Sequence, residues 1–220
     1  MKTINSFISE KLKVTKQILN KHKEYVDLGL PSGTLWAKCN IGAHEETEYG
    51  DYFAWGEIEP KKTYNWSTYK YCKGHFDDLT KYCNKSVFGH DDFTDNILQL
   101  EPSDDAAHVN MGDKWCIPTD EQFQELINNT TNEWIENYNG TGINGRLFTS
   151  KDNTLFLPAT GFMYEYKHLS SNQSGTYWSS IVDYQQHSGD AFCVYFWKDK
   201  LYLESKERNN GRVIRPVLNK

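Results

Sequence analysis

Hydrophobic and polar positions alternate with a period of two along residues 191–207, with one interruption at Lys198-Asp199. Because successive side chains of a strand point to opposite faces, this pattern predicts a β-hairpin with two different faces. The first face carries Phe192, Val194, Phe196, Leu201 and Leu203. The second face carries Tyr195, Trp197, Tyr202, Glu204 and Lys206, and Glu207 continues it. We expect the apolar face to pack on the core and the second face to point outward.

Other strands are predicted where β-branched and aromatic residues lie between turn signals. They cover residues 155–157, 176–179, 191–197, 200–205 and 212–217. The run Leu35-Trp36-Ala37 is a further strand signal near the start of the chain. Turn signals such as Asn139-Gly140 recur throughout the chain, and they predict short strands joined by long loops.

Two short helices interrupt this strand-rich pattern. Ser103 is placed to cap the first, over residues 104–108, whose acidic first turn suits the helix dipole. Thr119 is the predicted N-cap of the second, and Gln122 stands at the reciprocal position of a capping box. Its buried stripe is predicted to be Phe123, Leu126 and Ile127. Together these elements predict an α+β fold with few helices, short antiparallel strands and long ordered loops.

Two segments depart from this pattern. Residues 1–24 place apolar side chains at roughly helical spacing, which predicts an amphipathic segment ahead of one domain over residues 25–220. That segment either packs on the body, joins copies of the chain, docks onto a larger assembly or is a frayed tail. Residues 60–100 lack periodicity and are interpreted as a long ordered insertion. The aromatic residues expected to hold it include Tyr64, Trp66, Tyr69, Tyr71, Phe76 and Tyr82.

Composition and charge narrow the compartment and the partners. Five widely spaced cysteines do not indicate a disulfide framework, and residues 1–24 contain no apolar run typical of a secretory signal. We therefore expect synthesis in the cytoplasm, with packaging in a virion as one route of export. The formal net charge is −6, and six Lys against two Glu give residues 1–24 a charge of +4, which leaves −10 for the rest. Such an acidic body argues against nucleic-acid binding. The chain contains no run of about 18 apolar residues, so no membrane span is predicted.

The outward face of the predicted hairpin is the best candidate for a functional surface. Tyr and Trp mixed with Glu and Lys are typical of recognition surfaces, and 15% of the chain is aromatic. The alternative interpretation is structural: the insertion over residues 60–100 covers Tyr195 and Trp197, and both are core residues.

A series of motifs gives the chain a family resemblance. In order they are Tyr25 to Ala37 (YVDLGLPSGTLWA), Gly50 to Glu57 (GDYFAWGE), Asp104 to Ala107 (DDAA), Trp115 to Thr119 (WCIPT), Leu157 to Gly161 (LPATG), Tyr177 to Ser180 (YWSS) and Arg215 to Val217 (RPV). Together they resemble the Fibrobacter succinogenes major-domain family of gut Bacteroidetes, over residues 25–217. That resemblance implies a C-type-lectin-like fold of the branch that includes the formylglycine-generating enzymes.

The C-terminal part has a narrower resemblance. Tyr177 to Ser180, the alternating hairpin, Arg208 to Gly211 and Arg215 to Val217 resemble the variable proteins of diversity-generating retroelements. In those proteins the lectin fold displays side chains whose adenine-rich codons are diversified. The display positions implied here are Asp190, Cys193, Tyr195, Trp197, Lys200, Tyr202, Glu204, Lys206 and Glu207. Residues 1–24 also resemble leader segments of Bacteroides phage or prophage structural proteins.

Catalytic and metal-dependent functions lack the motifs that they need. Formylglycine-generating enzymes use copper and a C-terminal pair of cysteines, whereas Cys193 is alone in that region, so the chain is predicted not to be an enzyme. The Glu-Pro-Asn and Trp-Asn-Asp signatures of calcium-dependent sugar binding are also missing. Four soft or borderline ligands, Cys72, His75, Cys83 and His90, lie close enough in sequence for a zinc site. They fit equally well as buried small residues beside aromatic rings, and no cofactor is predicted.

Three hypotheses follow for function. The first is a display domain or adhesin, in its narrowest form a retroelement-diversified receptor-binding protein of a phage or prophage, whose partner is a protein or glycan on a bacterial surface. The second is a structural subunit that buries its aromatic face in an oligomer or larger particle and docks through residues 1–24. The third is a degenerate relative of the oxidase.

Overall fold

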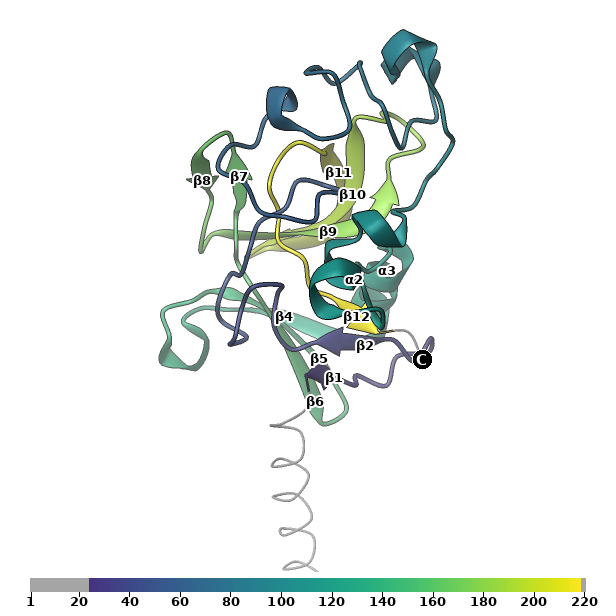
Figure 1. Cartoon of the computed structure of the whole chain (residues 1–220). Helices are drawn as coiled ribbons and strands as arrows, with labels where there is room; N and C mark the ends of the chain where they lie inside the picture. The colour runs from purple at the N-terminus through teal and green to yellow at the C-terminus, as the bar shows by residue number, and fades with distance from the viewer. Residues whose placement is uncertain (1–23, 219–220) are drawn as a thin grey trace, which may run out of the picture.

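A computed structural model describes residues 24–218, and the predicted amphipathic segment lies outside these residues apart from Glu24. The described chain has an α+β fold, in which short antiparallel strands form four sheets and long loops join them (Figure 1). This arrangement confirms the predicted class, with its few helices and short antiparallel strands.

The two ends of the described chain meet in one four-stranded sheet. Its strands, in order, are β1 (Tyr25–Val26), β2 (Leu35–Ala37), β12 (Val217–Leu218) and β3 (Trp115–Cys116). Val217 pairs with Trp36 on one side and with Cys116 on the other, and so ties three distant parts of the chain together. The prediction of a strand over residues 212–217 was wrong in extent. Only its last residue belongs to β12, and the preceding residues cross the core with single bridges at Arg212 and Val213.

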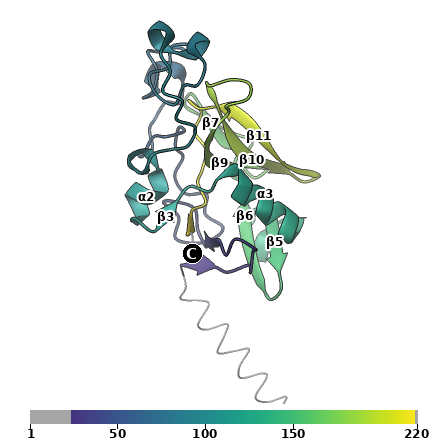
Figure 2. The same cartoon turned by 90° about the vertical axis from the view of Figure 1, so that its right-hand side faces the viewer.

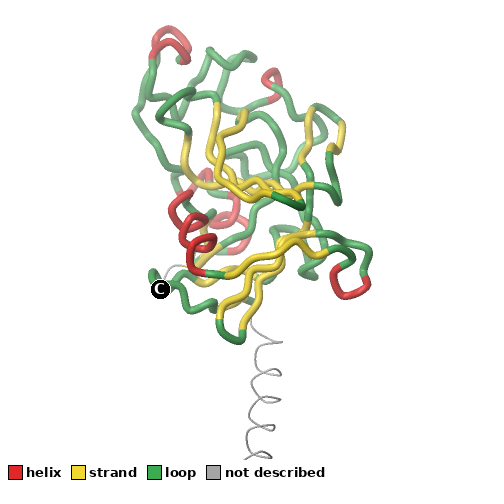
Figure 3. Tube along the Cα trace, turned by 180° about the vertical axis from the view of Figure 1, so that it is seen from behind, coloured by secondary structure: helices red, strands yellow, loops and turns green. Residues whose placement is uncertain are grey.

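Two three-stranded sheets and one small hairpin complete the strands. One sheet contains β4 (Thr131–Ile135), β5 (Gly145–Ser150) and β6 (Asn153–Pro158), and the other contains β9 (Ser174–Val182), β10 (Asp190–Trp197) and β11 (Lys200–Glu207). The small hairpin pairs β7 (Phe162–Tyr164) with β8 (Lys167–Leu169). Figure 3 shows the two three-stranded sheets as separate groups of strands seen from behind.

The helices begin where local capping dictates. Helix α3 (Asp120–Asn129) starts at the predicted capping box of Thr119 and Gln122, and Phe123 and Leu126 are buried against the sheets. The predicted Ser103 cap was wrong. Residues Pro102–Asp104 form a 3-10 turn, and the Asp105 carboxylate then accepts the backbone N–H groups of residues 107 and 108 to begin α2 (Ala106–Met111). None of the helices within residues 24–218 has the length and apolar character to cross a bilayer.

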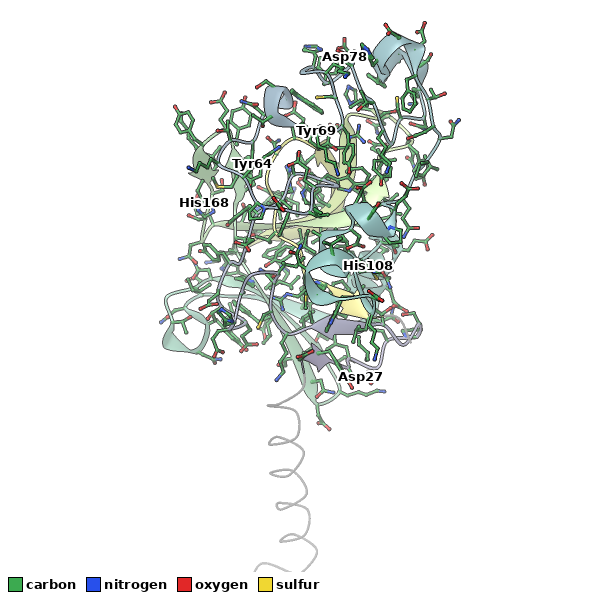
Figure 4. All side chains as sticks on the ribbon, viewed as in Figure 1. Asp27, Tyr64, Tyr69, Asp78, His108 and His168 are labelled. Atoms are coloured by element: carbon green, nitrogen blue, oxygen red, sulfur yellow. The ribbon has the colours of Figure 1, made fainter. Side chains whose placement is uncertain are left out.

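The insertion over residues 60–100 is ordered by its aromatic residues, as predicted. It forms three 3-10 turns, Trp66–Thr68, Ser86–Phe88 and His90–Asp92, in the loops drawn blue to teal in Figure 2. Tyr69, Tyr71 and Tyr82 are buried and meet edge to face, and Tyr82 continues this contact to Trp55. Figure 4 shows Tyr64 and Tyr69 within this upper part of the molecule.

Three arginines in the segment that follows β11 are buried. Arg208, Arg212 and Arg215 are each at most 3% exposed. Arg208 lies over the rings of Trp55 and Tyr69, so it joins the end of β11 to the insertion. Arg215 donates to the Asn40 side chain and to backbone carbonyls next to β2. These arginines take the place of apolar side chains by donating to carbonyls and lying over rings.

Candidate functional site

The β10–β11 hairpin has the two faces that its alternation predicts. Tyr195 pairs with Tyr202, and Trp197 pairs with Lys200, so these four residues share one face. On the opposite face Val194 and Phe196 are buried, and Leu201 and Leu203 pack partly buried against the same core cluster. The register therefore fixes which side chains reach the surface.

Three aromatic rings of the outward face hold one another in place. The ring centroids of Tyr195 and Trp197 are 5.3 Å apart, and each lies 5.8 Å from that of Tyr202. Tyr202 is 36% exposed, while Tyr195 and Trp197 are half-buried. Because the rings already pack together, little side-chain entropy would be lost when a ligand contacts them. We call Tyr195, Trp197 and Tyr202 the aromatic cluster.

The aromatic cluster forms one wall of a cavity of about 580 Å³. Phe162, Tyr164 and Leu169 of the β7–β8 hairpin form the opposite wall, and Thr176, Asn210 and Arg212 lie between the two walls. Sequence reasoning missed these six residues as site residues. Three of them lie in β7 and β8, which are only three residues long and too short for a clear alternation. The approach of all six to the cluster is a tertiary contact that no local pattern encodes.

Single backbone bridges fix the opposite wall in place. Met163 pairs with Gly211, and Glu165 pairs with Tyr64 of the insertion, so the β7–β8 hairpin is tied to two other parts of the chain. A side chain at Gly211 would come within 2.7 Å of the Tyr64 ring and 2.9 Å of Met163 Cβ, which explains a glycine there. The cavity therefore lies between two walls that are both held before a ligand arrives.

The turn of the β10–β11 hairpin is held from the other three-stranded sheet. Arg146 of β5 is 7% exposed and donates through Nη2 to the carbonyl of Trp197 at 2.8 Å and to that of Lys198 at 3.2 Å. Burial lowers the pKa of the Arg146 guanidinium, while the nearby Asp199 opposes that change. This contact fixes the end of the hairpin that carries Trp197.

Six of the nine predicted site residues line the cavity. They are Tyr195, Trp197, Tyr202, Glu204, Lys206 and Glu207. Lys200 lies outside the lining, with its Nζ 5.7 Å from the centre of the Trp197 ring. Asp190 also lies outside it, at the far end of β10 beside His187. Burial raises the pKa of Asp190, and His187 acts in the opposite direction.

The prediction of Cys193 as a display position was wrong. Its side chain is fully buried, in a core cluster that also contains Trp178 and Tyr69. Burial raises the pKa of the Cys193 thiol to about 11, so the thiol is neutral at pH 7. Core residues that include part of the insertion cover the Cys193 end of the face. The structural alternative concerned Tyr195 and Trp197, and neither belongs to the buried core. Tyr195 and Trp197 instead face the β7–β8 hairpin across the cavity.

The cavity is lined by two acidic and two basic side chains, Glu204, Glu207, Lys206 and Arg212. Lys206 Nζ lies 3.0 Å from Glu204 Oε2. Burial lowers the pKa of Lys206, but the interaction with Glu204 outweighs burial and raises it. Arg212 is buried over the Trp178 ring at 4.4 Å and donates to the backbone carbonyl of Glu207. Burial and the nearby Glu204 raise the pKa of Tyr202, which keeps its phenol neutral. The cavity thus combines aromatic surface with hydrogen-bond donors and acceptors.

The four residues considered for zinc are engaged separately. Cys72 Sγ donates to the carbonyl of Trp66, and Cys83 Sγ to that of Lys85. His75 pairs with Asp77, and His90 with Asp78. Within residues 24–218, no group of three or more His, Cys, Asp and Glu is placed to hold a metal ion, and all five cysteines are free thiols.

Comparisons with family models, curated proteins and solved structures found no match to the chain. What the site can do must therefore be inferred from its own side chains. Aromatic rings, two carboxylates, an ammonium and a guanidinium around a preformed hollow are groups that recognise a ligand by packing and hydrogen bonding.

Proposed function

We propose that the chain is a non-catalytic binding domain that captures its ligand between the aromatic cluster and the β7–β8 hairpin. The observation that carries this proposal is the preformed cavity, with three mutually packed rings on one wall. Binding sites of this kind gain affinity because their side chains lose little freedom on capture. The ligand is a protein or glycan on a bacterial surface, and the domain acts as an adhesin or receptor-binding protein.

The proposed fold is C-type-lectin-like, of the branch suggested by the sequence motifs. Three features support it. The chain is α+β with few helices, its two described ends pair in one sheet, and the residues between β8 and β12 bring a twisted hairpin to the surface. Such a scaffold permits changes on the outward face, because the inward face of the hairpin packs on the core independently of the outward side chains.

The retroelement hypothesis is proposed with a narrower set of display positions. Cys193 is buried and is removed from the set, whereas Tyr195, Trp197, Tyr202 and Glu204 all line the cavity. The encoding DNA tests this proposal. We expect adenine-rich codons at the retained positions, with a near-copy template and a reverse transcriptase gene close by. If the locus has neither, the retroelement hypothesis is refuted and the proposed binding function stands.

Binding to whole cells tests the proposed site. The double variant Trp197→Ala/Tyr202→Ala removes two of the three rings, and we expect labelled protein to lose at least tenfold in apparent affinity for cells of gut Bacteroidetes. Tyr184→Ala is the matched control, since Tyr184 is similarly exposed, at 41%, but lies outside the cavity. Circular dichroism and thermal unfolding verify that each variant folds. Unchanged binding by the folded double variant would refute the site.

A further inference from the structure

Strand β11 forms an open edge of its sheet. The strand order is β11-β10-β9, so β11 pairs with β10 on one side only (Figure 2). The edge at β9 is covered instead. The backbone N–H groups of Trp178, Ser180 and Val182 donate to carbonyls of three other segments, at 3.1, 2.8 and 2.9 Å. Of the two edges of this sheet, the β11 edge is therefore the one with room for another strand.

The available backbone groups of β11 belong to alternate residues. A two-residue turn joins Trp197 to Lys200, so these two residues form the first hydrogen-bonded pair of the hairpin. The N–H and C=O groups of Leu201, Leu203 and Ser205 then point away from β10. No backbone or side-chain group within residues 24–218 forms a hydrogen bond to them. Such an edge is a template on which a further strand can pair.

The edge lacks most of the features that block pairing between sheets. β11 is eight residues long, contains no proline and pairs with β10 in continuous register, without a bulge. Leu201 and Leu203, on its inner face, are only half-buried, so a strand alongside would cover them further. The charged side chains of β11 are the remaining obstacle, and they decide which partner fits.

A second copy of the chain fits these charges in one antiparallel register. Pairing about a two-fold axis at Tyr202 places Lys200 of each copy opposite Glu204 of the other, so two pairs of opposite charge form. The same register places Leu201 of each copy opposite Leu203 of the other. Lys200 is exposed and forms no ion pair within residues 24–218, so its ammonium group is available to a partner.

The neighbouring registers are unfavourable. An axis at Leu203 would place Lys200 opposite Lys206 twice, and an axis at Glu204 would bring two carboxylates together. An axis beyond Glu204 would need the carbonyl at the end of β11, which already accepts two hydrogen bonds. A slip by one residue would place the leucines of one copy beside the outward side chains of the other.

We infer that β11 pairs antiparallel with β11 of a second copy of this chain, about a two-fold axis at Tyr202. Backbone hydrogen bonds between Leu201 of each copy and Leu203 of the other would join the two three-stranded sheets edge to edge. Both cavities then open on the same side of the joined sheet, so the dimer presents two sites to one surface. This inference goes beyond the proposed function, and its tests need no ligand.

Sedimentation equilibrium of the full chain tests the pairing. We expect the 25.6 kDa monomer in equilibrium with a dimer. Lys200→Glu and Glu204→Lys each place like charges opposite one another twice, so each variant alone should dimerise roughly tenfold more weakly or worse. An equimolar mixture of the two variants restores both attractions and should form heterodimers about as well as the wild type. Lys114→Glu, at an exposed position outside β11, is the control and should dimerise like the wild type.

Three outcomes would overturn the inference. The first is a wild-type chain that stays monomeric up to about 1 mM. The second is a dimer that both charge reversals leave intact, because association would then use another surface. The third is a mixture of the two variants that fails to associate although circular dichroism shows that both are folded.

Disulfide cross-linking tests the register. Residue 202 faces residue 202 of the other copy as a non-hydrogen-bonded pair, with Cα atoms ~4.5 Å apart and within the range of a disulfide. Mild oxidation should therefore cross-link Tyr202→Cys, and peptide mass spectrometry should locate the bond at residue 202. Lys200→Cys should not cross-link, because its two copies would lie ~13 Å apart along the strands. The wild type, with five free cysteines, gives the background. Preferential cross-linking of Lys200→Cys would refute the axis at Tyr202.

Hydrogen exchange distinguishes a second copy from a strand of the ligand. Without cells, the amides of Leu201 and Leu203 should exchange more slowly in concentrated than in dilute protein. If they are protected only in cell-bound protein, β11 pairs with a strand of the ligand, so the self-pairing is refuted while the proposed binding function stands. If the dimer forms but cell binding does not depend on the aromatic cluster, the proposed function fails and the self-pairing stands.

Discussion

At the scale of single residues, burial decides which side chains can act. The period of two correctly placed Tyr195, Trp197 and Tyr202 on one face with Cys193, but it could not show that core residues cover only the Cys193 end. The prediction of Ser103 as the helix cap was wrong because residue type alone does not fix where the helix starts. Ser and Asp are both good caps, and the 3-10 turn at Pro102–Asp104 moves the helix start to Asp105.

Asp104 gives a prediction about acid stability. Its carboxylate accepts hydrogen bonds from Lys81 and Tyr82 and pairs with Lys70. Burial alone would raise its pKa, but these partners outweigh burial and lower it to about 2. Because the folded pKa is below the unfolded value of roughly 3.9, the stabilisation is present above pH 4 and disappears as the pH falls towards 2. We expect a contribution of about 1–2 kcal/mol to the free energy of unfolding.

Urea denaturation between pH 2 and pH 6 measures this contribution. Asp104→Asn should be less stable than the wild type above pH 4, and the difference should shrink as the pH approaches 2. Asp113→Asn is the control, because the Asp113 side chain is 97% exposed. A difference between the wild type and Asp104→Asn that does not vary with pH would contradict the assignment.

At the scale of elements, the site depends on how two hairpins face each other. The β10–β11 hairpin was predictable, because pairing between strands only two residues apart is written in the local alternation. The β7–β8 hairpin was missed, because strands of three residues give little periodicity, and its position depends on bridges to Gly211 and Tyr64. Local patterns therefore identified one wall of the cavity but not the other.

The β7–β8 hairpin carries a matched pair of tyrosines. Tyr164 is 44% exposed and lines the cavity, whereas Tyr166 is 70% exposed and lies outside the lining. If the ligand contacts both walls, Tyr164→Ala should lower affinity for cells about five- to thirtyfold, corresponding to ~1–2 kcal/mol, and Tyr166→Ala should leave it unchanged. Neither change should move the midpoint of thermal unfolding. Equal effects of the two variants on cell binding would show that the hairpin is not a wall of the site.

At the scale of the whole molecule, the segment over residues 208–217 joins the site to the rest of the fold. Arg208 lies under the insertion, Arg212 lies beside the cavity, and Val217 pairs inside the sheet of the two chain ends. The sequence predicted a strand over residues 212–217, whereas only Val217 of that range belongs to β12, and Arg212 and Arg215 are buried in the stretch before it. Long-range packing of charged side chains over rings leaves no simple pattern of hydrophobic spacing.

Arg208 tests the role of this segment. Arg208→Ala would remove the group that lies over Trp55 and Tyr69 and leave the carbonyl of Tyr82 without its 3.2 Å hydrogen bond. We expect a loss of about 3 kcal/mol in the free energy of unfolding. Arg208→Met keeps most of the volume and should lose less. Relative to the wild type, Arg208→Ala should accelerate hydrogen exchange more in residues 60–100 than in β9 and β10. Equal acceleration in all of these segments would contradict the role given to Arg208.

The proposed function requires that ligand is captured between the aromatic cluster and the β7–β8 hairpin. Hydroxyl-radical footprinting of the unmodified protein, free and bound to cells, tests it most directly because no variant has to fold. We expect protection of Trp197, Tyr202 and Tyr164 on binding, with no change at Tyr184 or Val87, which are exposed outside the cavity. Protection of Tyr184 or Val87 together with unchanged labelling of the three cavity residues would contradict it.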